Sequence, residues 1–312
     1  MSIILGSACC VAQASTKTIW VDGVNKDGGW YDVNKENPWI QDGDNDLCWA
    51  ATATNLITWW QDKYEVPEGI PNTKEEIWDT FKEKVNYDKG GDVHGAIQWW
   101  VSGVYTPLNY DESLRSIYGI GNSTILNSFD GYYHNRYQLN FYYDVWPFLE
   151  VESRPPYGDT TNYLAGIGDD LLELVGKGCG VGLSIGNDAG KLAHALTLWG
   201  IEYDEISGDI TKFWLTDSDD EQFNFNMDGL FTVAVTEKNG KLYINTTEND
   251  WYATDNDVFV NGVFAINPDY SDTWGIPLAR TLLTLSIPEP STAALSLLAL
   301  AGLAARRRRG TY

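Results

Sequence analysis

The stretch DNDLCWAATATNLITWW, from Asp44 to Trp60, decides which fold and which chemistry are expected of this chain. Its apolar residues recur at helical spacing, which predicts an amphipathic helix. Asp44, Asn45 and Asp46 are all common N-cap residues, so the helix should begin within a residue or two of Cys48. A helix N-terminus carries partial positive charge and open N–H groups, and both favour a thiolate. Cys48 is therefore a candidate nucleophile; the alternative is a buried structural cysteine.

Two faces are expected on this helix. One apolar face should pack into a core and comprises Trp49, Ala53, Leu56, Ile57 and Trp60. A neighbouring face of mixed character comprises Cys48, Thr52, Asn55 and Trp59. This division predicts that the sulfur faces a cleft while the opposite side of the helix anchors it.

The composition indicates a folded and acidic protein. The chain has 312 residues, with 14 Trp, 18 Tyr and 10 Phe, which is ample material for a hydrophobic core. Its formal net charge of −23 argues against nucleic acid as a partner and against binding to anionic lipid surfaces.

Residues 1–14 resemble a signal peptide. Residues 2–14 are short and apolar and end in Ala12-Gln13-Ala14, which predicts cleavage before Ser15. The basic residues that usually begin such a segment are missing, so Met1 need not be the true start. Cleavage would leave two cysteines, Cys48 and Cys179. A disulfide between them is one alternative, but the glycine-flanked strand around Cys179 favours packing as a small hydrophobe.

The C-terminus combines three features in a fixed order. Pro288-Glu289-Pro290 precedes an apolar run at 293–305, and four arginines follow at 306–309. This order resembles the PEP-CTERM sorting signal, which exosortases recognise, and the resemblance implies export and anchoring or release at the cell surface. A plain C-terminal membrane anchor is the alternative. The expected organisation is a signal peptide at 1–14, one domain at 15–267, a linker at 268–287 and a sorting and membrane segment at 288–312.

Helices are expected before strands along the chain. Further helices are predicted at 73–85, 93–101 and 169–175, and aromatic strands with turns at 131–149. Later strands are predicted at 181–185, 192–203 and 211–217, with several short ones up to residue 266. This order predicts an α+β fold in which helices pack against an antiparallel sheet.

A cysteine nucleophile needs an imidazole beside it, and the chain has three histidines. His94 lies near a predicted helix start, where a structural or exposed role is expected. His134 lies in a polar, turn-like segment, where exposure is expected. His194 differs from both because it lies inside a predicted strand.

The predicted hairpin brings His194 to a carboxylate. A turn centred near Ser207 pairs residues whose numbers sum to about 414, which places His194 opposite the acidic run from Asp217 to Asp220. Adjacent strands lie about 4.8 Å apart, so a carboxylate should lie within reach of the imidazole. An acidic loop beside a core histidine is the alternative.

No metal or cofactor site is predicted. Asp42, Asp44 and Asp46 have the spacing of the first ligands of a calcium loop. The glycine at the sixth position of such a loop and its distal glutamate are both missing from the sequence here.

Three blocks resemble the immunoglobulin-degrading cysteine endopeptidases of the IdeS/Mac family, which have a papain-like fold. The blocks are GWYDVNK at 29–35, the helix stretch at 44–60, and HALTLWGIEYDEISGDITKFWLTDSDD at 194–220. A weaker match covers LLELVGKGCGVGLS at 171–184. About 102–160 shows little resemblance.

The resemblance assigns roles to five residues. It implies that Cys48 is the nucleophile and that His194 is the general base and acid. It also implies that Asp217 orients the histidine and that Asp219 is a second aspartate beside it. Lys35 matches a lysine that the family uses at the oxyanion site, together with the N–H of the nucleophile.

The sequence departs from the family pattern in three places. Trp49 replaces a glycine after the nucleophile, which predicts a bulkier cleft wall. The segment from Lys35 to Cys48 is a few residues longer, and the regions that would grip an antibody are not recognisable. The resemblance therefore implies an exported cysteine endopeptidase that acts on an extracellular protein. An immunoglobulin and a mucosal protein are the two candidate substrates. Alternatives are another thiol acyl-transfer enzyme, such as a transglutaminase or peptidoglycan amidase, and a surface binding protein without turnover.

Overall fold

The structure is a computed structural model of the whole chain. It describes residues 15–36, 44, 46–63, 66–84, 91, 93–103, 131–133, 149–152, 166–187, 193–219, 229–245 and 258–266. The chain divides into two units, Met1–Trp274 and Gly275–Tyr312, and every described residue belongs to the first. The predicted signal peptide, linker and C-terminal membrane segment lie outside the described residues. Within the described part of the chain, no helix combines the length and hydropathy that a membrane crossing requires.

Helix α1 begins within the predicted range, at Cys48, but is not capped as predicted. It spans Cys48–Gln61, and Leu47 occupies the N-cap position without a side-chain hydrogen bond to the helix. The Asp44 carboxylate instead accepts the N–H of Glu36 at 2.8 Å. The prediction of an Asp or Asn cap is therefore wrong, because a longer-range contact engages the Asp44 side chain.

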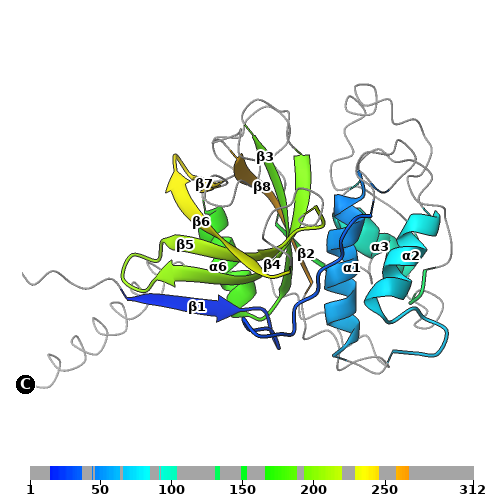
Figure 1. Cartoon of the computed structure of the whole chain (residues 1–312). Coiled ribbons are helices and arrows are strands. Elements are labelled where there is room, and N and C mark those ends of the chain that lie inside the picture. Colours follow the sequence, from blue (N-terminus) through cyan, green and yellow to red (C-terminus); the bar gives the residue numbers. More distant parts are fainter. Residues whose placement is uncertain are drawn as a thin grey trace, which may run out of the picture. The chain divides into compact units, whose positions relative to one another are not determined.

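Two further helices pack beside α1, and a third packs near the sheet (Figure 1). Helix α2 spans Lys74–Lys84 and helix α3 spans Val93–Ser102, and both contact α1. Helix α6 spans Ile167–Gly176 and packs against strands of the sheet. All three lie close to their predicted positions.

Strands form a single antiparallel sheet, as predicted for an α+β chain (Figure 1). The strands are β1 (Thr16–Trp20), β2 (Leu149–Glu152), β3 (Gly180–Asn187), β4 (Ala193–Asp204), β5 (Ile210–Thr216), β6 (Phe231–Lys238), β7 (Lys241–Ile244) and β8 (Val258–Ile266). Their order is β1-β4-β3-β8-β7-β6-β5, and β2 pairs with β8. Because β5 also pairs with β4, the path from β4 through β3, β8, β7, β6 and β5 returns to its start and closes the sheet on itself.

The aromatic segment at 131–149 is described only in part. Tyr132 and Tyr133 form a turn whose N–H groups donate to the carbonyls of Trp100 and Val101 at the end of α3. Leu149 begins strand β2. The rest of this prediction lies outside the described residues.

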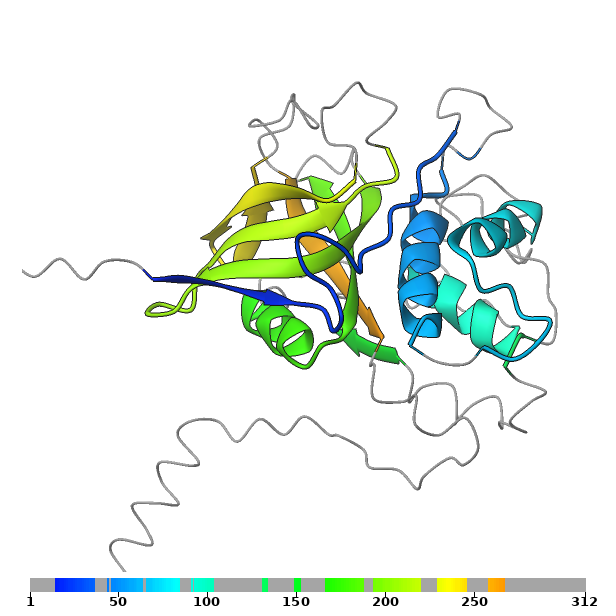
Figure 2. The same cartoon turned by 60° about the horizontal axis from the view of Figure 1, so that its bottom comes forward.

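Helix α1 is buried on nearly all sides because it lies between the sheet and the other two helices (Figures 1 and 2). Every residue of α1 except Cys48 is buried, so the face predicted to be mixed is also covered. Strand β3 approaches closely where it has glycines: a Cβ on Gly180 would lie 2.6 Å from the ring of Trp59. Helix α1, which carries Cys48, is thus packed against the sheet on one side and against α2 and α3 on the other.

The helices share an aromatic core. Phe81 of α2 contacts the rings of Trp49, Trp99 and Trp100, with centroids 5.4 to 6.4 Å apart. Buried Gln61 at the end of α1 accepts hydrogen bonds from Trp100 Nε1 and the Tyr133 hydroxyl. These contacts satisfy polar groups that burial would otherwise penalise.

The register of the β4–β5 hairpin is as predicted. Ile201 pairs with Phe213, and the ladder ends where Thr197 pairs with Thr216. The chain therefore leaves the ladder at the residue before Asp217, and Asp217 follows directly beyond the paired segment. The hairpin carries His194 and the acidic run to the same end of the sheet.

Candidate active site

Cys48 is the first residue of α1 and the only residue of that helix that is not fully buried. The first N–H groups of a helix have no acceptor within it, and they carry the positive end of the helix dipole. The sulfur therefore lies in an environment that favours negative charge. Cys179, the residue before β3, is buried, and no disulfide joins it to Cys48. Its predicted role as a small hydrophobe agrees with this burial.

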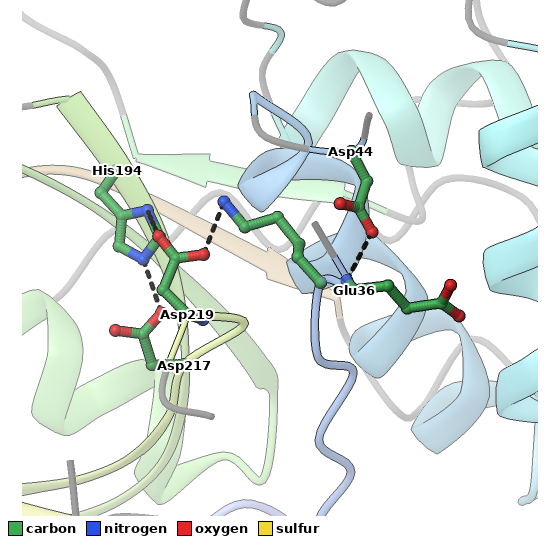
Figure 3. A network of polar contacts seen from close by, with 6 residues as sticks. Glu36, Asp44, His194, Asp217 and Asp219 are labelled. Atoms are coloured by element: carbon green, nitrogen blue, oxygen red, sulfur yellow. Dashed lines mark hydrogen bonds and ion pairs between the residues drawn. The ribbon is translucent and has the colours of Figure 1, made fainter. Parts of the chain in front are cut away.

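His194 lies on β4, opposite Ile185 of β3, and is only 6% exposed. Its Nε2 atom lies 2.6 Å from Oδ1 of Asp217. Figure 3 shows the two side chains pointing toward each other. The structure thus brings together the histidine and the aspartate that the hairpin register predicts. A short hydrogen bond between buried groups of this kind fixes the orientation of the ring.

The Asp217 carboxylate is itself held in place. Oδ1 also accepts the backbone N–H of Asp219 at 3.0 Å, which closes a turn on the Asp217 side chain. Because Asp217 engages Nε2 of His194, the other ring nitrogen, Nδ1, is left to face the thiol. This arrangement sets the tautomer that a general base requires.

The thiol of Cys48 is hydrogen-bonded to His194, and its pKa is lower than that of an ordinary cysteine. Burial is the largest influence and acts in the opposite direction. The positive charge of His194, its hydrogen bond to the sulfur and the ammonium of Lys35 together outweigh the burial. The site therefore favours the thiolate, the reactive form of cysteine.

The pKa of His194 is raised well above that of a free imidazole. Burial again opposes this direction. The negative charges of Asp217 and Cys48, and the hydrogen bonds to both, dominate. Cys48 and His194 thus stabilise each other as a thiolate–imidazolium pair.

Lys35 lies inside the same network. Its side chain is 2% exposed, and Nζ lies 2.5 Å from Oδ1 of Asp219. Its backbone N–H donates to the carbonyl of Ser218 at 2.9 Å, which ties it to the chain that follows β5. Burial lowers the pKa of Lys35, but the charges of Asp219 and Cys48 outweigh this, so the pKa is raised and the ammonium stays charged.

Asp219 connects Lys35 to His194. Figure 3 shows Asp219 beside His194. Its Oδ2 atom lies 3.8 Å from Nδ1 of His194. Burial and the neighbouring charge of Asp217 raise the pKa of Asp219, although His194 and Lys35 act in the opposite direction. All five residues singled out in the sequence therefore meet in one cluster.

Three residues of this cluster carry groups that can bind metal ions. Ligand atoms of His194, Asp217 and Asp219 lie within 4.8 Å of one another. However, Nε2 of the histidine is bonded to Asp217, and the Lys35 ammonium lies against Asp219. A cation would have to enter beside an ammonium and break the histidine–aspartate pair, so this donor set fits a proton-transfer site better than a metal site.

Trp49 does not form a bulky cleft wall. It is 2% exposed and packs edge-on against Phe81 in the helical core. A Cβ on Gly91 would lie 2.4 Å from the indole, so the absence of a side chain there makes room for the ring. The cleft wall that the resemblance implied is therefore wrong. The expectation from helical periodicity, that Trp49 packs into the core, is confirmed.

The other two histidines take no part in the described cluster. His94 is buried in α3, which agrees with a structural role and not with the exposed role that was the other expectation. His134 lies outside the described residues.

Sequence reasoning missed the roles of Asp44 and Ser218. Asp44 was expected to cap the helix, and the contribution of Ser218 is a backbone carbonyl that any residue could supply. The position of Asp44 just before the helix was the available signal for its contact with Glu36. The same position also fits a helix cap, so the sequence alone does not separate the two roles.

Comparison with known proteins gives three matches. The chain is 24% identical over 225 residues to the IgM protease of Streptococcus suis (strain P1/7), an alignment that covers 62% of this chain and 18% of that protein. The chain therefore corresponds to less than a fifth of the relative's length. A PEP-CTERM protein-sorting motif matches residues 286–309, which confirms the predicted sorting signal.

The third match is to a family model. The model described as Mac 1 covers residues 15–92 and 131–260, more than half of the chain. The match resumes at residue 131, so the resemblance extends further into 102–160 than the sequence alone indicated. It includes Cys48 of α1, His194 of β4 and Asp217, which directly follows β5. The chain belongs to the Mac 1 family.

Proposed function

We propose that this protein is an exported cysteine endopeptidase with Cys48 as its nucleophile. One observation carries the proposal: a thiol at a helix N-terminus is hydrogen-bonded to a buried imidazole that Asp217 holds at 2.6 Å. Thiol, imidazole and carboxylate in this order are the parts that acyl transfer by cysteine requires. Membership of the Mac 1 family supports the same reading.

The proposed reaction begins with attack of the Cys48 thiolate on a peptide carbonyl. The sulfur–carbon bond forms, and the carbonyl oxygen takes up the negative charge. His194, protonated in the resting pair, gives its proton to the leaving amine as the peptide bond breaks. Water then attacks the thioester, with the neutral imidazole as general base, and releases the acid product and the thiol.

Two donors are proposed for the oxyanion. One is the backbone N–H of Cys48, which has no acceptor within α1. The other is the ammonium of Lys35, which lies close enough to Cys48 to lower the pKa of its thiol. In this scheme Asp219 holds Lys35 charged and near the sulfur until the oxyanion forms.

A papain-like fold is proposed for the domain at 15–267. Its support is that the two layers contribute different parts of the site. The helical layer of α1, α2 and α3 provides Cys48. The closed antiparallel sheet provides His194 and, directly after β5, Asp217. The site forms where α1 packs against β3 and β4.

The proposed substrate is an extracellular protein, and immunoglobulin is the first choice to test. The matched relative is an IgM protease, although this chain corresponds to only 18% of its length. Mucosal proteins are the second choice, because the sequence shows no recognisable antibody-gripping regions.

Export and surface location are proposed from the two ends of the chain. Residues 1–14 would direct export, and the PEP-CTERM motif at 286–309 would be processed by an exosortase-type enzyme. In this arrangement 268–287 is a linker, and 293–305 within the segment 288–312 holds the chain in the membrane until processing.

Incubation with IgM, IgG and mucosal glycoproteins tests the proposed activity. New protein N-termini in the products would support the peptidase. Ammonia release or cross-linked products would indicate a transglutaminase, and cleaved muropeptides would indicate an amidase. Tight binding without any product would favour a surface binding protein.

A further inference from the structure

Asp44 connects the segment that carries Lys35 to the beginning of α1. Its Oδ2 atom accepts the N–H of Glu36 at 2.8 Å (Figure 3). Its own carbonyl oxygen accepts the N–H of Leu47 at 3.0 Å, and Leu47 directly precedes Cys48. Asp44 is 7% exposed, so its carboxylate makes this contact in a site shielded from water, where a charge-assisted hydrogen bond is strong.

Neighbouring N–H groups of the lysine segment are held by opposite parts of the fold. The N–H of Lys35 donates to Ser218, which follows strand β5, at 2.9 Å. The N–H of Glu36 donates to Asp44, which precedes helix α1. The backbone around the lysine is therefore fixed to the sheet and to the helix at once.

Two of the contacts of Lys35 lie on the sheet side. Both Ser218, which accepts its backbone N–H, and Asp219, which holds its ammonium, belong to the chain after β5. Cys48 belongs to the helix side. The Asp44–Glu36 hydrogen bond ties the backbone next to the lysine to the residues that directly precede this helix.

We propose that Asp44 is a positioning residue that fixes the Lys35 ammonium relative to the Cys48 sulfur by accepting the N–H of Glu36. The proposal rests on the peptidase function proposed above. The Asp44 carboxylate acts by accepting the backbone N–H of Glu36. The charges that act on the thiol belong to other residues, namely His194, Lys35 and Asp219.

The first test measures the Cys48 thiol without any substrate. The rate of its alkylation by iodoacetamide is followed against pH in the full chain. Asp44→Ala should raise the apparent pKa of the thiol, as Lys35→Met should, because in both variants the ammonium no longer lies near the sulfur. Asp44→Asn should keep the native pKa, because an amide oxygen can still accept the N–H of Glu36.

Glu36→Ala is the matched control. It leaves the backbone N–H in place and removes an exposed side chain, whose carboxylate lies 3.7 Å from the Lys82 ammonium. It should alkylate and turn over like the native chain. If Asp44→Ala lowers the melting temperature strongly, Asp44→Leu, which keeps the side-chain volume, takes its place.

The second test is a double-mutant cycle on kcat. Asp44→Ala should lower kcat by about 10- to 100-fold, with a smaller change in KM, because a misplaced catalytic group has this effect. In a Lys35→Met background the same change should have almost no further effect, since the group it positions is absent. Additive losses would overturn the proposal, and so would an Asp44→Asn variant as impaired as Asp44→Ala.

The two readouts separate this inference from the proposed function. A chain that cleaves nothing, but whose thiol pKa rises equally in Asp44→Ala and Lys35→Met, would support the positioning role and refute the peptidase. Native cleavage together with a native thiol pKa in Asp44→Ala would refute the positioning role and leave the peptidase intact.

Discussion

Nε2 of His194 lies 2.6 Å from Oδ1 of Asp217, and both side chains are almost completely buried. The residues are neighbours because the β4–β5 ladder ends at the pair Thr197–Thr216, directly before the aspartate. In this position the carboxylate orients the imidazole and stabilises its charged form.

Asp217→Asn should therefore lower kcat by about 10²- to 10⁴-fold while the fold is retained, because an amide can also donate to Nε2 and so favour the wrong tautomer. Steady-state kinetics and circular dichroism check this. Asp209→Asn, at an exposed position in the same hairpin, is the control and should behave like the native chain. Loss of folding in Asp217→Asn, or unchanged kcat, would contradict the assignment.

The pH profile of kcat/KM should be a broad bell. On the acid side, activity rises as Cys48 loses its proton, and because the pKa of this thiol is lowered, the rise begins below the range of an ordinary cysteine. On the alkaline side, activity falls as His194 loses its proton, and because its pKa is raised, the fall lies above the range of a free imidazole. Lys35 should not limit the profile, since its pKa is also raised. A profile that rises only near pH 8 to 9, where free cysteine ionises, would contradict the ion pair.

Lys35→Met should lower kcat by about 10²- to 10³-fold with a small change in KM, because it removes one proposed oxyanion donor and keeps the buried alkyl chain. Lys63→Met is the matched control: Lys63 also forms an ion pair, with Asp22 at 2.6 Å, but belongs to the other end of α1. Equal losses in the two variants would show that the effect is structural and would remove Lys35 from the site.

Trp49→Gly restores the residue type of the family pattern and should destabilise the protein by about 3–5 kcal/mol, because it empties a buried position in the aromatic core. Urea unfolding measures this, and kcat of the folded variant should change by only a few-fold. Gly91→Ala should destabilise the native chain but much less so in the Trp49→Gly background, since the Cβ then no longer meets the ring. A stable Trp49→Gly variant with altered substrate preference would instead return Trp49 to the cleft wall.

The elements of the site that depend on local pattern were predictable from the sequence. The start of α1 near Cys48 follows from the helical periodicity of the apolar residues. The approach of His194 to Asp217 follows from the turn position, because hairpin register is fixed by the turn and propagates along the strands.

The remaining features depend on contacts between segments far apart in the sequence. Lys35 reaches the site through the carbonyl of Ser218 and the carboxylate of Asp219, and no local pattern encodes either contact. For the same reason Asp44 was expected to be a helix cap. The family resemblance likewise predicted Trp49 at the cleft wall, whereas the helical periodicity correctly placed it in the core. The choice between two plausible partners for one side chain is made by tertiary packing, which a single sequence does not display.

Cleavage by the native chain compared with Cys48→Ala tests the central claim most directly. Both proteins are incubated with the substrate that the survey of immunoglobulins and mucosal proteins identifies, and the new N-termini are sequenced. We predict that the native chain produces defined new termini, that Cys48→Ala produces none, and that the two unfold at closely similar temperatures. The same fragments from a folded Cys48→Ala variant would contradict the claim that Cys48 is the nucleophile.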